Sequence, residues 1–195
     1  MPLHVERLTG PAMLPALPAL ARLRISEFLD WPYLYNGSQE YEELYLKEFA
    51  ASQGAVIVTA SNGDDIVGVS TGAPLVHHQN EFATPFMRAG YDIGCIFYFG
   101  ESVLQPRFRG QGIGHRFFDE REAHARSLGF THTTFCSVVR PDDHPAKPPG
   151  VVPLDAFWSK RGYKKIDGLV AHFSWPDVGE LEKTQKPMQF WIRPL

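Results

Sequence analysis

The chain has 195 residues and a mass of 22.0 kDa, enough for one domain with a full core and too little for two typical ones. We therefore expect a single domain over residues 1–195. Apolar residues make up 44% of the sequence and charged residues 21%, as in ordinary globular proteins. The formal net charge of -3 argues against a general nucleic-acid binder, because such proteins are usually basic.

The two cysteines, Cys95 and Cys136, both lie inside apolar runs. A disulfide scaffold would need more cysteines, so we expect buried thiols and a cytoplasmic location. No apolar run is long enough to span a bilayer, and no membrane contact is expected. The apolar stretch 12–21 is interrupted by Pro15 and Pro18, so we interpret it as the approach to a helix rather than as a signal peptide. The eight histidines show no metal-ligand spacing, and no metal site is expected.

Apolar periodicity and turn residues predict the elements in chain order. These are a strand at 3–8, helices at 19–29 and 38–53, strands at 55–60 and 65–76, an irregular segment or short helix at 77–90, a strand at 95–104, a helix at 112–128, a strand at 131–139, a proline-rich loop at 141–153, a short helix at 154–161, and strands at 169–175 and 188–193. The second helix has Ser38 as N-cap, and its aromatic stripe (Tyr41, Leu44, Tyr45 and Phe49) is expected to face the core. The pattern indicates a mixed α/β chain with one sheet.

The most informative segment joins the strand that ends at Leu104 to the helix that opens near Gly112. Glycines alternate there at 110, 112 and 114. Glycine permits a tight turn and a close approach of a ligand to the main chain. The first amides of a helix lack internal partners and carry the positive end of its dipole. Such a loop suits a phosphate or pyrophosphate, and Arg107 and Arg109 add positive charge.

Three known anion-binding loops can be compared with this segment. The P-loop needs Gly-Lys-Ser/Thr, which does not follow these glycines. The dinucleotide fingerprint needs a glycine where His115 stands. A third pattern, Arg/Gln-x-x-Gly-x-Gly/Ala at a strand-to-helix junction, fits Arg109, Gly112 and Gly114 without a gap.

This third pattern is the acetyl-CoA loop of the GNAT superfamily of N-acetyltransferases, which the chain resembles. The order of elements matches along most of the chain, and the segment from Phe157 to Tyr163 is similar to the family's late helix. The resemblance implies a mixed, mostly antiparallel sheet flanked by helices. It also implies an acyltransferase that moves an acetyl group from acetyl-CoA to the primary amine of a small molecule by direct attack.

The resemblance further implies which residues would hold coenzyme A. The loop amides that would bind the pyrophosphate are those of Arg109, Gly110, Gln111, Gly112, Ile113, Gly114 and His115. Val103 and Leu104 would pair with the pantetheine, and the Leu104 amide would polarise the thioester carbonyl as oxyanion donor. Phe157 and Lys160 would flank the thiol end.

Glu101 is the candidate base or water-orienting group, because a carboxylate is unexpected inside an apolar run unless it is paired or functional. The alternative is a structural ion pair, with Arg107 or Arg140 as partner. Where many family members have a tyrosine as general acid, this chain has Trp158, whose indole supplies no acidic proton. Three other donors are open: Tyr98, Ser159 and Cys136.

The sequence does not identify the acceptor. Trp31, Tyr33 and Tyr35 lie between the two early helices, where the family often lines its acceptor site, so they either favour an aromatic or apolar acceptor or belong to the core. In the proline-rich loop, His144 with Asp142 and Asp143 either contacts a cationic substrate or is solvated.

Two other functions stay open at this point. Trp158 would suit a non-catalytic acyl-CoA-binding or sensor domain of the same fold, and the glycine-rich loop alone would suit an unrelated nucleotide-binding domain. The last strand, with Phe190 and Trp191, could also pair with a second copy of the chain to form a homodimer.

Overall fold

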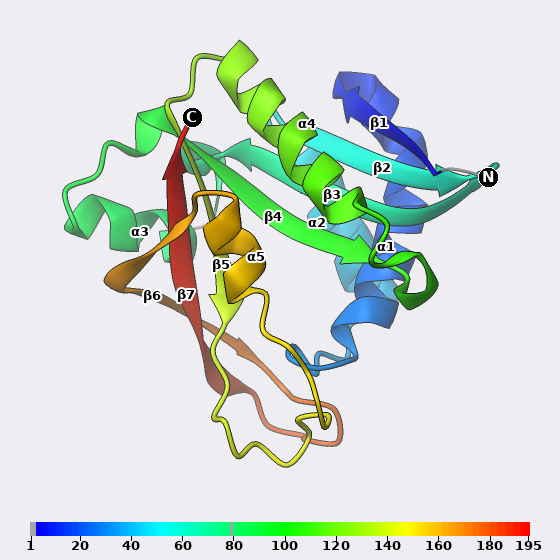
Figure 1. Cartoon of the computed structure of the whole chain (residues 1–195), viewed down its shortest axis with the longest axis vertical. Helices are drawn as coiled ribbons and strands as arrows, with labels where there is room; N and C mark the ends of the chain where they lie inside the picture. The colour runs from blue at the N-terminus through cyan, green and yellow to red at the C-terminus, as the bar shows by residue number, and fades with distance from the viewer. Residues whose placement is uncertain (1–2, 79) are drawn as a thin grey trace.

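The computed structural model describes residues 3–78 and 80–195 (Figure 1). In chain order the helices and strands are β1 (His4–Thr9), α1 (Leu17–Phe28), α2 (Gln39–Ala51), β2 (Val56–Asn62), β3 (Asp65–Pro74), α3 (Asn80–Arg88), β4 (Ile96–Leu104), α4 (Ile113–Ser127), β5 (His132–Val138), α5 (Asp155–Lys160), β6 (Lys164–Trp175) and β7 (Thr184–Pro194). Short 3₁₀ segments precede α1 (Gly10–Ala16) and follow β4 (Pro106–Phe108).

The strands form one sheet in the order β1-β2-β3-β4-β5-β7-β6. The β4–β5 pair is parallel, and the other neighbouring pairs of the described chain are antiparallel. Helices α4 and α5 cover one face of the sheet, and α1 and α2 cover the other (Figure 1). The predicted fold class, a mixed and mostly antiparallel sheet flanked by helices, is confirmed. Within the described residues, no helix is both long enough and apolar enough to cross a membrane.

Helix α1 attaches to the sheet through Leu20 and Leu23, which are buried with Leu46 of α2 and the strand residues beneath them. Ser38 caps α2 as expected, since its side chain accepts a hydrogen bond from the Tyr41 amide at 3.3 Å.

The predicted core-facing stripe of α2 is partly wrong. Tyr41 and Leu44 are exposed, whereas Glu42 and Leu46 are buried with Phe49. The helix is rotated because it directs Glu42 inward, where an arginine of α1 binds it.

Strand β4 contains a bulge that reverses the direction of its side chains. Ser70 of β3 lies opposite Ser102, and Gly72 lies opposite Phe99, so Thr71 faces two residues of β4, Gly100 and Glu101. Only glycine fits at position 100, because a Cβ there would lie 2.5 Å from the buried Thr71 Oγ1.

The reversal is visible in the packing on each side of the bulge. Phe97 and Phe99 pack under α4, and a regular alternation would place residue 101 on that face too. Instead Leu104 packs under α4, while Val103 packs under α1 and α2. The bulge therefore turns Glu101 toward α1.

Strands β4 and β5 separate soon after they meet. They pair only at Ile96–Tyr98 with His132–Thr134, whereas β5 stays paired with β7 as far as Val138. Beyond Tyr98 and Thr134 the sheet therefore opens on one side of β4.

The end of the chain differs from prediction in two ways. Strands β6 and β7 are longer than expected, because a wide bulge at 166–169 interrupts the alternation of β6. The Gln189 Nε2 amide fills this bulge and donates to the carbonyls of Ile166 (2.9 Å) and Leu169 (3.2 Å). The expected docking strand for a second copy is also wrong: β7 is paired on both sides, and Phe190 and Trp191 are buried.

We expect Leu20→Ala to lower the free energy of unfolding by about 2–5 kcal/mol, because the truncation leaves a cavity where α1 meets the sheet. Leu181→Ala is the matched control: this leucine is fully exposed, so its loss should change stability by less than about 0.5 kcal/mol. Urea unfolding of both variants measures the difference. Equal effects would contradict the placement of α1.

Candidate active site at the diverging strands

The segment after β4 forms one 3₁₀ turn and then opens into α4. The amide of Phe108 donates to the Gln105 carbonyl at 3.0 Å, and that of Arg109 donates to the Pro106 carbonyl at 3.1 Å. Gly112 is the N-cap of α4 with a φ of 80°, a left-handed conformation that favours glycine. The first hydrogen bond of the helix runs from the Arg116 amide to the Gly112 carbonyl at 3.3 Å.

Six consecutive amides, from Gly110 to His115, donate to no group in the described part of the chain. They lie at the positive end of the α4 dipole, and no side chain caps them. An array of this kind binds a phosphate or diphosphate. Seven amides were predicted to bind the pyrophosphate, and for Arg109 this prediction is wrong. Its amide already donates to the Pro106 carbonyl inside the 3₁₀ turn.

The Arg109 side chain ties the loop to its surroundings. Its Nη2 lies 2.6 Å from Glu27 Oε2 on α1, and its Nε donates to the Leu104 carbonyl at 3.1 Å. The guanidinium therefore holds the end of β4 in place. It adds positive charge beside the free amides but forms no hydrogen bond with them.

The amides of β4 alternate between β3 and the opening. The Gln105 amide donates to the Val67 carbonyl of β3 at 3.0 Å, so the Val103 amide, two residues earlier, also turns toward β3. The amides of Ser102 and Leu104 then point into the opening. Leu104 thus has the orientation its expected role requires. Val103 does not reach the opening, because β3 uses its backbone and its side chain is in the core.

Glu101 is ion-paired, but with neither of the arginines expected. Its carboxylate binds Arg24 Nη1 of α1, and Arg24 Nε binds Glu42 Oε2 at 2.5 Å. The guanidinium also lies 5.1 Å from the Phe28 ring and 4.9 Å from the Tyr45 ring. Burial opposes the charged form of Arg24, but the carboxylates of Glu101 and Glu42 outweigh burial and raise its pKa. Arg24 therefore holds the two carboxylates on either side of one guanidinium.

Neutral hydroxyl and thiol groups lie around Glu101. Burial, with the nearby Glu101 charge, raises the pKa of both Tyr33 and Tyr45. Tyr98 Oη lies 3.1 Å from Cys136 Sγ across the point where β4 and β5 part. Burial raises the pKa of Tyr98 and raises that of Cys136 to about 12. These groups hold their protons at neutral pH.

Helix α5 brings one of its two predicted residues to the loop. The Phe157 ring lies 4.8 Å from the His115 ring and in contact distance of Gly114, at the first turn of α4. Lys160 is exposed. Trp158 is a packing residue, because its indole lies 5.0 Å from the Phe135 ring and 5.1 Å from the Trp191 ring.

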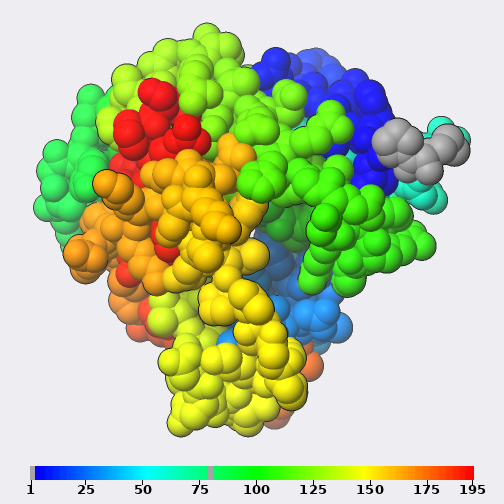
Figure 2. Space-filling view, in the orientation of Figure 1, coloured from blue at the N-terminus to red at the C-terminus, as the bar shows by residue number. Residues whose placement is uncertain are grey.

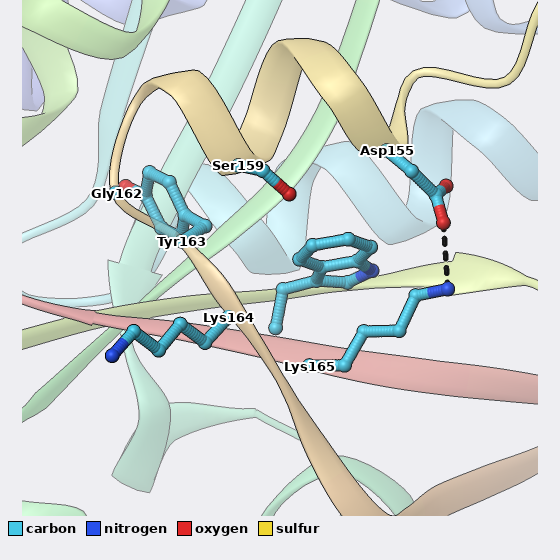
Figure 3. Close-up of a pocket in the computed structure, with 7 residues that line it drawn as sticks. Asp155, Ser159, Gly162, Tyr163, Lys164 and Lys165 are labelled. Carbon is cyan, nitrogen blue, oxygen red and sulfur yellow. Dashed lines mark ion pairs between the residues drawn. The ribbon is translucent and has the colours of Figure 1, made fainter.

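Ser159 faces away from the diverging strands. With Asp155 and Lys165 it lines a groove of about 450 Å³ beside Trp191 (Figure 3). The Asp155 and Lys165 side chains form an ion pair across this groove at 2.6 Å. This position gives no support to Ser159 as a proton donor.

Figure 2 shows the surface hollowed between the orange-yellow atoms around α5 and the green atoms of the segment after β4. Blue atoms from the N-terminal part of the chain lie deeper in this hollow. The arrangement in Figure 1 places the hollow over the separation of β4 and β5.

The comparison with known proteins agrees with this geometry. A sequence model of the acetyltransferase (GNAT) family matches residues 21–148. The chain belongs to this family. The expectation of an acyltransferase is thereby confirmed. No curated protein sequence matches the chain.

Solved GNAT structures share the fold at low identity. The ribosomal-protein-alanine N-acetyltransferase of Brucella melitensis has a TM-score of 0.63 and 14% identity, over 99% of this chain and 100% of that chain. A phosphinothricin acetyltransferase of Sinorhizobium meliloti in complex with AcCoA has a TM-score of 0.61 and 15% identity, over 100% of this chain and 89% of that chain. An aminoglycoside 6'-N-acetyltransferase complexed with coenzyme A has a TM-score of 0.57 and 16% identity, over 98% of this chain and 96% of that chain.

Arg140 organises the side of this GNAT domain where Tyr33 lies. Its Nη1 and Nη2 donate to the Asp177 carboxylate at 2.6 Å and 2.8 Å. Its Nε donates to the Pro32 carbonyl at 2.8 Å, and its Nη2 also donates to the Tyr33 carbonyl at 2.7 Å. The Trp175 indole donates to the same Tyr33 carbonyl at 3.0 Å. These bonds fix the segment between α1 and α2 against β5 and the β6–β7 hairpin.

The proline-rich loop reaches the same segment, since the His144 ring lies 5.2 Å from that of Trp31. Asp142 forms an ion pair with Lys147 at 3.0 Å and is otherwise solvated. The aromatic residues Trp31, Tyr33 and Tyr35 are all half-buried. Of the three, Trp31 supports the proline-rich loop through its contact with His144.

Sequence reasoning missed Arg24, Glu42 and Ser102. Arg24 and Glu42 have ordinary positions in helical patterns, and nothing local marks them as buried partners. Ser102 could have been found, because a glycine inside a strand pattern signals a bulge that redirects the following amides.

We expect Asp177→Asn to destabilise the protein at neutral pH, by a margin that shrinks in acid. Burial disfavours the Asp177 carboxylate, but hydrogen bonds from Arg140 and Lys186 outweigh burial and lower its pKa. This stabilisation is complete above the unfolded pKa of about 3.9 and is lost as the pH falls through the lower native value.

Urea unfolding from pH 7 to pH 3 measures the margin. Asp142→Asn, at an exposed carboxylate, is the control and should change little at any pH. A margin for Asp177→Asn that stays constant with pH would contradict the ion pair.

Proposed function

We propose that this GNAT domain, acting as a single unit over residues 1–195, transfers the acetyl group of acetyl-CoA to a primary amine of a small molecule. The observation that carries the proposal is the run of six unpartnered amides, Gly110 to His115, beside the separation of β4 and β5. The first feature suits a diphosphate, and the second leaves an unpaired strand edge where an extended amide-containing arm can bind.

The residues of the loop would hold the diphosphate of acetyl-CoA, with Phe157 beside the first turn of α4. The Leu104 and Ser102 amides would pair with the arm, and one of them would polarise the thioester carbonyl. The Leu104 carbonyl already accepts from Arg109, so this end of the edge is braced. When bound, acetyl-CoA supplies an activated acetyl group.

Glu101 is proposed to accept the proton of the amine, directly or through one water. An ordinary alkylammonium has a pKa of about 10.4 and no lone pair for attack, so a proton must leave first. The Glu101 carboxylate forms an ion pair with Arg24, and it lies on the strand whose next residues carry the donor amides.

A dedicated acid is not required at the leaving group. A thiol has an ordinary pKa of about 8.5, so the thiolate can leave with little assistance. Tyr98 and Cys136 remain protonated and can donate a hydrogen bond at the parting of the strands. Trp158 packs against Phe135 and Trp191, and this structural role supports the catalytic proposal over a non-catalytic sensor.

The half-buried tyrosines Tyr33 and Tyr45 support a small acceptor with apolar surface. Similar folds act on amines of varied size, since one solved neighbour is named for an aminoglycoside and another for a ribosomal-protein alanine. The free thiols of Cys95 and Cys136 support the proposed cytoplasmic location.

We expect Gly112→Trp to abolish the thermal stabilisation by coenzyme A. The left-handed backbone strains any other residue, and the indole would cover the free amides without meeting the core, since no atom lies within 4 Å of a Cβ there. For the unaltered protein, ligand at about 100 times its Kd adds about 2.7 kcal/mol, or roughly 5–10 °C in Tm.

Gly179→Trp is the matched control, because that glycine is also left-handed and also has open space. It should keep the response to coenzyme A. A coenzyme A response that survives Gly112→Trp, or a stronger response of the unaltered protein to ATP, would refute the proposed function.

We expect Glu101→Gln to lower amine acetylation by about a hundred-fold or more, since the amide cannot accept the proton. Glu42→Gln is the control, because Glu42 binds the same arginine from a fully buried position. Steady-state rates with a panel of primary amines test both. Equal losses in the two variants would make Glu101 a structural ion pair.

A further inference from the structure

Arg121 of α4 is a buried arginine without a carboxylate partner. It is 1% exposed, and no carboxylate lies within ion-pair distance of it in residues 3–78 and 80–195. Its guanidinium carbon lies 4.2 Å from the Phe99 ring and 5.0 Å from the Phe118 ring. Burial lowers the pKa of Arg121 to about 10, which leaves it charged at neutral pH.

The partners of Arg121 are the polar groups around the β4 bulge. Nη1 donates to the Thr71 carbonyl at 3.0 Å and to the Glu101 carbonyl at 3.4 Å. Nη2 donates to Ser102 Oγ at 2.9 Å, and Nε donates to the Phe117 carbonyl of its own helix at 3.1 Å. One planar fork therefore joins α4 to both strands at the residues where their register shifts.

A charge in this position needs a reason, because a buried unpaired ion is strongly destabilising and an apolar side chain would fill the same space. The bulge supplies the reason. It leaves carbonyl groups of Thr71 and Glu101 outside the regular ladder, and a guanidinium can satisfy several acceptors at fixed angles.

The direction of the active groups depends on this register. If the bulge were removed by a one-residue slip, every later side chain and amide of β4 would change sides. Glu101 would then face α4, and the Leu104 amide would turn toward β3. The bulge is thus a condition for having the carboxylate toward α1 and the amides in the opening.

We propose that Arg121 is a positioning residue for acetyl transfer, which acts by fixing the β4 bulge. The inference rests on the proposed function. Arg121 holds the Glu101 backbone from the α4 face, while Arg24 holds its carboxylate from the α1 face. Arg121 touches neither the free amides of the loop nor the opening itself, so its removal should affect turnover more than binding of coenzyme A.

The test compares Arg121→Met with Arg126→Met, a control at a half-exposed arginine of the same helix. Titration with coenzyme A counts the competent sites, and the acetylation rate is expressed per site. We expect Arg121→Met to lower this rate about ten- to a hundred-fold, with the KM for acetyl-CoA changed less than about two-fold. Arg126→Met should match the unaltered protein.

Arg121→Lys separates charge from geometry, because lysine keeps the charge and lacks the fork. We expect it to fold and to remain impaired in rate per site. Full recovery in Arg121→Lys, or an unchanged rate per site in Arg121→Met, would overturn the proposal and leave Arg121 a structural residue.

Hydrogen exchange keeps the proposal testable if Arg121→Met yields no stable protein. In Arg121→Lys we then expect faster amide exchange across residues 99–105 than in Arg126→Met, and equal exchange across β2. Equal exchange at 99–105 would overturn the proposal. Absence of coenzyme A binding by the unaltered protein would instead refute the proposed function.

Discussion

The register shift in β4 is the constraint on which the rest of the site depends. Two residues of β4, Gly100 and Glu101, lie opposite the single residue Thr71 of β3. Position 100 requires glycine, because the Thr71 side chain occupies the space that a Cβ would need. From this shift follow the direction of Glu101 toward α1 and the direction of the Leu104 amide into the opening between β4 and β5. A regular strand of the same composition would place these groups on the wrong sides.

Three buried or nearly buried arginines hold this arrangement in place. Arg24 binds two carboxylates between α1, α2 and β4, Arg121 binds the bulge, and Arg140 binds Asp177 and two carbonyls of the segment between α1 and α2. Such interactions contribute little net stability, because desolvation of the ions offsets most of their attraction. Their effect is geometric: each guanidinium fixes several acceptors at once, and removal of one partner leaves a charge exposed to an apolar interior.

The local features of the site could be predicted from the sequence, and the long-range ones could not. The glycine pattern at 110–114 identified the loop, because amides at a helix start have no internal partners whatever the rest of the fold. The partner of Glu101 was missed because Arg24 lies 77 residues away, on an element whose periodicity indicates only an amphipathic helix. Val103 and the Arg109 amide were misassigned for a related reason, since their orientation follows from ladder pairing and from one 3₁₀ turn.

The free amides of the loop can be observed directly. In a ¹⁵N-labelled sample titrated with coenzyme A, we expect the amide resonances of Gly110 to His115 to shift most, with those of Ser102 and Leu104 shifting when acetyl-CoA replaces coenzyme A. The Arg109 and Phe108 amides, already bonded within the 3₁₀ turn, should shift less. Shifts confined to the groove beside Trp191, or spread evenly over the sheet with the loop unmoved, would contradict the placement of the acyl carrier at the start of α4.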